Sequence, residues 1–278
     1  VFPALGAFAV IPFAGQSVEI FGITIRPYLS DINIGLLYLL AISSLGVFGI
    51  VLGGWASNSK YPMLGALRSA AQMVSYEVSL GFSIIGVLMI AGTASMVGIV
   101  QAQKEIGLWF FIPQVVGLFI YFVSGVAETN RNPFDLPEAE NELVAGFHTE
   151  YSGMRFAFFF LAEYINMIVI GTIVVTLFLG GWLPPTTIVE RWIPQLALLT
   201  PYLENFFPFL GALGSMATGI FWFATKTFIV IFIYLWMRAT FPRYRYDRLM
   251  ALGWKWLIPL SIANVFATGI VLVLIKMI

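Results

Sequence analysis

The sequence predicts an all-α polytopic membrane protein, and three observations support this fold class. Sixty per cent of the 278 residues are apolar, only 10% are charged, and the mean hydropathy is +0.92. Such a composition lies far outside that of soluble domains. Apolar runs of roughly 20 residues, which cross about 30 Å of hydrocarbon as a helix, recur along the chain. We therefore treat residues 1–278 as a single transmembrane domain.

Six segments are apolar and long enough to span a membrane, near residues 33–56, 73–98, 107–128, 155–181, 211–237 and 256–277. A seventh run, residues 1–14, is too short alone and is typical of the end of a truncated span. Because the chain starts at Val1 without a methionine, we expect an N-terminally incomplete chain. The expected count is seven transmembrane helices, the first partial, and eight in the full-length protein. Segment 182–210, which holds several prolines, is predicted to be an outward loop.

The basic residues predict the orientation. If the spans alternate, nine of the 14 basic residues fall on one side, in or beside segments 57–72, 129–154 and 238–255. By the positive-inside rule this side faces the cytoplasm or matrix, and we call it the inward side. We expect residues 129–154 to form an inward acidic loop and residues 238–255 an inward basic loop.

Four ionisable residues lie in or at the ends of the predicted spans, namely Glu77, Glu128, Glu163 and Lys226. Each charge at mid-bilayer costs on the order of 3 kcal/mol, so these side chains must face the bundle interior, water or one another. Glu163 lies about 12 Å down its helix at 1.5 Å per residue. Lys226, near mid-membrane, must pair with a carboxylate or lose its charge readily. The set is typical of a proton relay, although ion transporters share it, and Glu77 and Glu128 taken singly are equally well explained as interfacial acids.

The inward acidic loop is the most informative stretch, because six acidic residues fall between positions 128 and 150 on the side that should favour positive charge. Asp135 followed by Glu138, with a proline between them, predicts a short helix that ends at Gly146. Glu138 and Glu142 would share one face, with Glu140 turned away. A capped, solvated surface helix is the alternative explanation.

Several classes of site are excluded or disfavoured. The chain has no cysteine and one histidine, His148, which excludes thiolate-held iron–sulfur clusters and bis-histidine haem within it. We predict no metal site, because no second histidine completes one. No glycine-rich phosphate loop is present, and the balance of 14 basic and 14 acidic residues gives no reason to expect nucleic acid. Segment 236–255 is explained equally well as an anchor in lipid headgroups or as a docking surface for a soluble partner.

Five segments together resemble the H-subunit family of NADH-quinone oxidoreductase, which supplies the membrane quinone-chamber subunit of respiratory complex I. The resemblance covers essentially the whole chain, in the expected order, and its second segment is highly specific. The segments are GWASNSKYPMLGALRSAAQMVSYE at 54–77, AETNRNPFDLPEAENELVAGFHTEY at 127–151, AEYINM at 162–167, LFLGGW at 177–182 and RATFPRYRYDRLMALGWK at 238–255.

The resemblance implies a subunit of a proton-translocating NADH:quinone oxidoreductase, a translocase, that couples quinone reduction to proton pumping. In this family the subunit binds no redox cofactor, quinone is the substrate, and iron–sulfur clusters and FMN are held by partner subunits. Expected partners are soluble iron–sulfur and quinone-site subunits on the inward face, small membrane subunits, antiporter-like subunits and lipid. The bacterial inner membrane is favoured over the mitochondrial inner membrane as the location.

The resemblance also implies roles for individual residues. The carboxylate path would contain Glu77, Glu128 and Glu163, to which we add Lys226 because of its predicted burial in the membrane. The quinone chamber would be lined by acidic loop residues and held by two cations, which are Asp135, Glu138, Glu140, Glu142, Arg68 and Arg131.

Three other functions stay open from the sequence. One is the related membrane subunit of membrane-bound hydrogenases or of complexes with another electron donor. A secondary ion transporter acting alone is disfavoured because such proteins carry inverted repeats, and we find no repeat. A purely structural anchor predicts that the intramembrane carboxylates tolerate neutral substitution.

Overall fold

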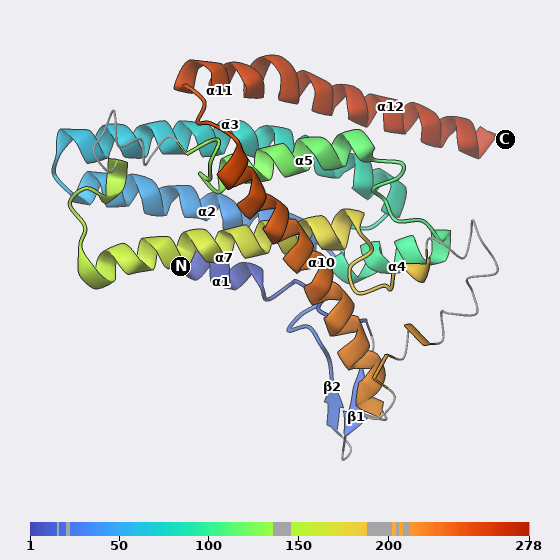
Figure 1. Cartoon of the computed structure of the whole chain (residues 1–278). Coiled ribbons are helices and arrows are strands. Elements are labelled where there is room, and N and C mark those ends of the chain that lie inside the picture. Colours follow the sequence, from blue (N-terminus) through green and yellow to red (C-terminus); the bar gives the residue numbers. More distant parts are fainter. Residues whose placement is uncertain are drawn as a thin grey trace.

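In the computed structural model the chain forms a bundle of membrane-length helices (Figure 1). The structure describes residues 1–15, 17–20, 23–135, 146–187, 202–203, 206–207 and 212–277. Within these residues, five helices are long and apolar enough to cross a membrane. They are α2 (Gly35–Ala56), α3 (Lys60–Ala91), α7 (Gly153–Phe178), α10 (Ala212–Thr240) and a continuous run that joins α11 (Tyr246–Leu252), the π-helical turn η4 (Gly253–Leu257) and α12 (Ile258–Met277).

Shorter elements complete the described part of the chain. They are α1 (Phe2–Ala7), the antiparallel hairpin of β1 (Val18–Ile20) and β2 (Ile23–Ile25), α4 (Met96–Ile106), α5 (Val115–Glu128) and the 3-10 helix η1 (Gly146–His148). The hairpin and α4 were not expected from the hydropathy pattern. Alternation over three-residue strands is too short a signal to separate from a loop.

The predicted count of seven transmembrane helices is not confirmed. The run 1–14 is helical only in α1, and α5 is shorter than the predicted span near 107–128. Pro113 precedes the helix, and proline in a helix interior removes a hydrogen bond and clashes with the preceding turn. The turn before Pro113 instead packs on the end of α7, where the amide of Phe111 donates to the carbonyl of Phe178 at 3.0 Å.

The start of α3 is the largest error in the predicted boundaries. The helix begins at Lys60, not near residue 73, and a predicted loop over residues 57–72 reduces to a short connection before Lys60. The first turns of α3 contain polar residues that hydropathy assigns to a loop, but Ser69 and Gln72 are fully buried. They are buried because α5 and the segment after it cover this end of α3, and tertiary contacts of this kind are invisible to a hydropathy window.

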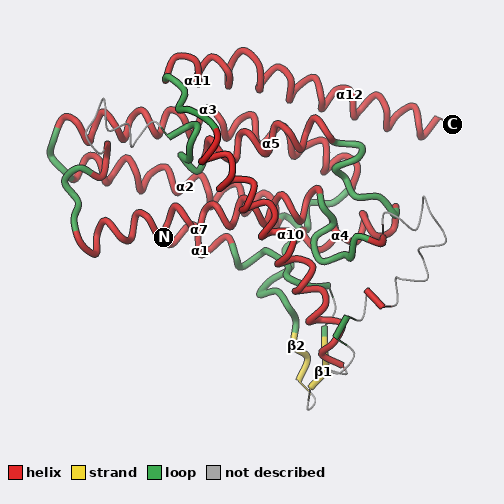
Figure 2. The backbone as a smooth tube through the Cα atoms, in the orientation of Figure 1, coloured by secondary structure: helices red, strands yellow, loops and turns green. Residues whose placement is uncertain are grey.

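The helix ends that were predicted to face inward lie together. The end of α2, the start of α3, the start of α7 and η1 occupy one end of the bundle, on the left in Figure 1. In the backbone trace of Figure 2, α10 runs obliquely across the other helices and contacts α7, and β1 lies against α10. The bundle therefore has a common inward end.

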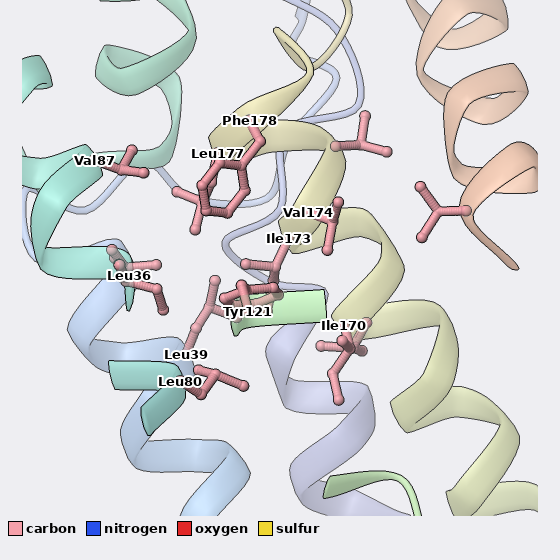
Figure 3. Close-up of a cluster of buried hydrophobic side chains, with 14 of the residues drawn as sticks. Leu36, Leu39, Leu80, Val87, Tyr121, Ile170, Ile173, Val174, Leu177 and Phe178 are labelled. Carbon is pink, nitrogen blue, oxygen red and sulfur yellow. The ribbon is translucent and has the colours of Figure 1, made fainter. Parts of the chain in front are cut away.

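The apolar core lies between α2, α3, α5 and α7, beyond the inward end. Because lipid is as apolar as these side chains, the core stabilises the bundle through close packing rather than through exclusion of water. Its central members interdigitate in Figure 3, which labels Leu36, Leu39, Leu80, Val87, Tyr121, Ile170, Ile173, Val174, Leu177 and Phe178.

Candidate functional site

A cavity of about 260 Å³ lies among α1, α2, α5, α7 and η1. Three carboxylates are among its lining residues, Glu128, Asp135 and Glu163. The rest of the lining is largely apolar, with aliphatic and glycine residues of α2 on one side and phenylalanines of η1 and α7 on the other. A largely apolar cavity with a few convergent polar groups is the usual form of a small-molecule site.

Glu128 is the last residue of α5 and is buried, with 6% of its surface exposed. Glu77, on α3, lies close enough for the two carboxyl groups to interact electrostatically. The Glu77 carboxylate also accepts a hydrogen bond from the Ser44 hydroxyl of α2. Glu77 does not line the cavity itself, so it forms the next carboxyl group beyond Glu128 along the α3–α5 contact.

Glu163 is paired with Arg131. The Nε atom of Arg131 lies 3.0 Å from Oε1 of Glu163, and both side chains are largely buried. Charge rather than an aligned hydrogen bond holds this pair, because neither Nε nor Nη2 of Arg131 has a well-oriented acceptor among the described residues. The guanidinium also lies over the ring of Tyr164, with Cζ 4.3 Å from the ring centroid. Arg131 is thereby fixed beside the carboxylate that it neutralises.

Asp135 connects the inward acidic loop to the inward basic loop. Nη2 of Arg243 lies 3.2 Å from Oδ2 of Asp135, and the amide of Tyr244 donates to the carbonyl of Pro133 at 3.0 Å. The rings of Phe134 and Tyr244 stack at 5.8 Å. Residues 133–135 and 243–244 thus form one packed unit at the inward end.

Three residues of α3 hold the neighbouring turns in place. Gln72 donates from Nε2 to the carbonyls of Ala127 and Phe134, each at 2.8 Å, and so ties the chain on both sides of Arg131 to α3. Arg68, one turn earlier on α3, lies over the ring of Tyr246 with Cζ 5.8 Å from the centroid. Gly65 lets η1 approach α3, because a Cβ there would lie 3.0 Å from the Phe147 nitrogen.

His148 lies in an aromatic cage beside the cavity. Its ring centroid is 3.8 Å from that of Phe147 and between 5.3 and 5.9 Å from those of Phe156, Phe159 and Phe160. The side chain is buried, and Nδ1 has no hydrogen-bond partner in the described part of the chain. Burial lowers the pKa of His148 to about 4, so the imidazole is neutral at physiological pH.

Lys226, on α10, is held by backbone carbonyls. Its Nζ donates to the carbonyls of Leu179, Gly181 and Leu183 at 2.7, 3.0 and 2.6 Å. The ammonium also lies 3.9 Å from the ring centroid of Trp109. These carbonyls follow the end of α7, about 24 Å along the helix from Glu163 at 1.5 Å per residue. Among the described residues Lys226 has no carboxylate partner within salt-bridge distance.

The turn that presents these carbonyls depends on two glycines. Gly180 and Gly181 have φ of 74° and 52°, a left-handed conformation that favours glycine. A Cβ at Gly180 would lie 2.6 Å from Nε1 of Trp109, and one at Gly181 would lie 2.8 Å from Val100. The LFLGGW segment is therefore a close-packed turn around the ammonium.

The structure brings together only part of the predicted site. Glu128, Asp135 and Glu163 line one cavity, Arg131 joins them through Glu163, and Glu77 lies behind Glu128. Arg68 lies outside the cavity lining on α3, and Lys226 lies at the opposite end of α7. The predicted helix of the acidic loop and its three carboxylates, Glu138, Glu140 and Glu142, lie outside the described residues.

Sequence reasoning did not find several residues that contact the site. Ser44, Asn130 and Arg243 are ordinary polar residues in the sequence, and only the fold places them against a carboxylate or the cavity. His148 was noted but given no place in the site. Among the described residues, no group of three or more histidine, cysteine or acidic side chains is arranged to hold a metal ion.

Comparison with known proteins gives consistent matches. A family model described as NADH dehydrogenase matches residues 1–269. The chain is 48% identical over 274 residues to the H subunit of NADH-quinone oxidoreductase from Magnetococcus marinus, a match that covers 99% of this chain and 69% of that protein. It is 51% identical over 271 residues to the H subunit from Rhodospirillum centenum, with coverages of 97% and 70%. The H subunit from Rhodospirillum rubrum is 51% identical over 268 residues, with coverages of 96% and 69%.

Proposed function

This chain belongs to the NADH dehydrogenase family and is a homologue of the H subunit of NADH-quinone oxidoreductase, and from that premise we propose its role in the complex. It forms part of the quinone-binding chamber of a proton-translocating NADH:quinone oxidoreductase. It also carries the carboxylate path that couples quinone reduction to proton pumping. The observation that supports this most directly is the cavity that gathers Glu128, Asp135 and Glu163 at the inward end.

The cavity suits a flat, largely apolar substrate such as a quinone. Its apolar walls on α2 and α7 would pack against the ring and the isoprenoid tail, and the carboxylates would face the polar end. Quinone reduction consumes protons and changes the charge inside this cavity. A carboxylate in low-dielectric surroundings responds strongly to such a change, because charge–charge interactions there are much stronger than in water.

The coupling follows from the order of the carboxyl groups. Glu128 and Glu163 line the cavity, and Glu77 interacts with Glu128 from the neighbouring helix. A proton gained or lost at the cavity therefore shifts the protonation of Glu128 and Glu163 first and of Glu77 afterwards. Ser44, which donates to Glu77, would hold that carboxylate in place between proton transfers.

The cations have a different part in this proposal. Arg131 keeps Glu163 ionised until the charge in the cavity changes, since a neighbouring cation favours the carboxylate form. Arg243 holds Asp135 of the inward acidic loop against the inward basic loop. Arg68 joins α3 to the inward basic loop through Tyr246. Lys226 does not carry protons in this scheme. It caps the carbonyls that follow α7, which fixes the far end of the helix that bears Glu163.

The remaining parts of the complex follow from the family. Quinone is the substrate, and this chain binds no redox cofactor, so the iron–sulfur clusters and FMN belong to partner subunits. Soluble iron–sulfur and quinone-site subunits dock on the inward face. The proton path continues into small membrane subunits and antiporter-like subunits. The five long apolar helices among the described residues make the chain a multi-pass integral membrane protein, and the bacterial relatives favour the bacterial inner membrane.

The proposal is tested by neutral substitutions in the assembled complex. Glu163→Gln and Glu128→Gln remove one titratable group each at nearly constant volume, and we expect both to lower quinone reductase activity and proton pumping by at least about tenfold, the scale of a lost general acid–base group. Glu105→Gln is the matched control, because Glu105 is exposed on α4 away from the cavity. A structural anchor would tolerate all three changes equally, and unchanged rates in both cavity variants would refute the proposal.

A further inference from the structure

Tyr234 of α10 is buried, and its hydroxyl has no hydrogen-bond partner among the described residues. The ring packs on that of Phe122 of α5, with 4.7 Å between the two centroids. A buried polar atom without a partner is rare in folded proteins, because burial removes the bonds that water would make, so it calls for an explanation. Tyr234 does not line the cavity, and its missing partner must therefore be sought among the neighbouring side chains.

The hydroxyl of Tyr234 lies beside Gly125, which precedes Glu128 by three residues on α5. A Cβ added at Gly125 would lie 3.2 Å from the Tyr234 hydroxyl oxygen, so the glycine leaves room for the hydroxyl next to the helix. Side chains on a helix point back towards its N-terminus, and the Glu128 carboxyl group can therefore extend over the turn that contains Gly125. Tyr234 and Glu128 also lie close enough to interact electrostatically.

The surroundings of Glu128 contain few groups that could donate a hydrogen bond to its carboxylate. The guanidinium of Arg131 pairs with Glu163, whereas the two neighbouring tyrosines carry neutral hydroxyl donors. Of these, Tyr234 is the one beside the turn over which the carboxyl group can extend. The titratable or charged groups around Glu128 among the described residues are Glu77 of α3, Tyr121 of α5, Glu163 of α7, Tyr234 of α10, and Arg131, Asp135 and His148 at or beside the cavity.

On this geometry, and resting on the function proposed above, we propose that Tyr234 is a positioning residue for Glu128. When Glu128 loses its proton, the Tyr234 hydroxyl donates a hydrogen bond to the carboxylate and keeps its own proton. Hydrogen bonds from a hydroxyl to a carboxylate are short and strong, so the ionised side chain is drawn towards α10 and away from the cavity. When Glu128 binds a proton again, it gives up this bond and turns back to the cavity. The unpartnered hydroxyl then belongs to the state in which Glu128 lines the cavity.

The test compares Tyr234→Phe with the unmodified protein in the assembled complex. Proton pumping is measured over a series of pH values after reconstitution into vesicles. Without the hydroxyl, the ionised form of Glu128 loses its donor, so Glu128 should hold its proton to a higher pH. We expect the pH of half-maximal pumping on the acidic side of the profile to rise by about one to two units, the effect of one hydrogen bond to a charged group. An unchanged pH profile would overturn the inference.

Tyr151→Phe is the matched control, because it also removes a single tyrosine hydroxyl. Tyr151 donates to the carbonyl of Gly53 at 2.7 Å, so this change should lower Tm by roughly 1–6 °C and leave the pH profile unchanged. Tyr234→Phe should show the opposite pattern, with a shifted profile and a Tm no lower than that of the unmodified complex, because a hydroxyl without a partner does not stabilise the fold. A fall in Tm as large as that of Tyr151→Phe would show that the Tyr234 hydroxyl is already bonded in the resting protein, which contradicts the inference.

Glu128→Gln separates this inference from the function on which it rests. Glutamine cannot ionise, so adding Tyr234→Phe to Glu128→Gln should change pumping by less than about twofold, and a larger change would show that Tyr234 acts elsewhere and not through Glu128. If Glu128→Gln lowers pumping and Tyr234→Phe leaves the pH profile unchanged, only the role of Tyr234 fails. If Glu128→Gln leaves pumping unchanged, Glu128 is not on the proton path and the inference fails with it. NADH oxidation with an artificial acceptor confirms assembly of each variant, and Tyr234→Met replaces Tyr234→Phe in the pH series if that complex does not form.

Discussion

Replacement of Lys226 by methionine gives a sharp test of how the outward end of α7 is held. Methionine keeps most of the apolar stem, so the change removes the ammonium rather than the packing. The carbonyls of Leu179, Gly181 and Leu183 then lose their shared donor. The expected consequence is loss of stability, because these carbonyls lie in a turn from which water is largely excluded.

The magnitude follows from the three contacts. A hydrogen bond to a charged group contributes about 1.5–3 kcal/mol net, but burying the ammonium offsets part of the sum for three such bonds. Removal of the ammonium leaves three carbonyls without their donor, and a buried polar group without a partner costs about 1–3 kcal/mol. We therefore expect Lys226→Met to lower the free energy of unfolding by about 3 kcal/mol. At roughly 2–4 °C per kcal/mol for a chain of this size, Tm falls by roughly 6–12 °C.

The assay is thermal unfolding of the purified complex in detergent, with Lys104→Met as the control. Lys104 is exposed in the last turn of α4, and such surface changes stay within about 0.5 kcal/mol. Equal Tm values for the two variants would refute the capping role. The number of protons pumped per electron should be retained in intact Lys226→Met complexes, and a lowered ratio without loss of stability would return Lys226 to the proton path.

Two further predictions concern the inward end. In a double-mutant cycle, Arg131→Gln and Glu163→Gln should show a coupling energy of about 1–3 kcal/mol in unfolding, and additive effects would contradict the ion pair. Because burial holds the pKa of His148 near 4, below its ordinary 6.5, only the unfolded chain binds a proton between these values. Stability should therefore fall as pH drops from 6.5 towards 4, by at most about 1.4 kcal/mol per unit. His148→Phe should flatten this part of the denaturation profile, and an identical pH dependence would contradict the buried neutral imidazole.

Hydropathy predicts the long spans of this fold well, because each is a continuous apolar run. The helices α2, α7 and α10 begin and end within a few residues of the predicted limits. The start of α3 was missed because its polar residues are buried by other parts of the chain. Gln72, for example, is fully buried and bonded to two carbonyls that follow it by more than 50 residues. Such contacts have no local sequence signal.

The sequence predicted several residues of the candidate site, but it did not predict which residues they contact. The positions of Glu128 and Glu163 relative to the inward helix ends follow from counting residues, and both do line one cavity. Their partners follow from the tertiary structure. Lys226 was expected either to pair with a carboxylate or to lose its charge readily. Among the described residues the carboxylate partner is not found, and the side chain lies against a glycine turn. His148 looked like a single polar residue in a loop until the fold surrounded it with phenyl rings.

The central claim is that the carboxyl groups of the cavity change protonation when quinone is reduced. The most direct measurement is the infrared difference spectrum between the oxidised and reduced complex, in the region where protonated carboxylic acids absorb. We predict a carbonyl band that disappears in Glu128→Gln or Glu163→Gln and persists in Glu105→Gln. A difference spectrum that is identical in all three variants and the unmodified complex would contradict the proposed coupling.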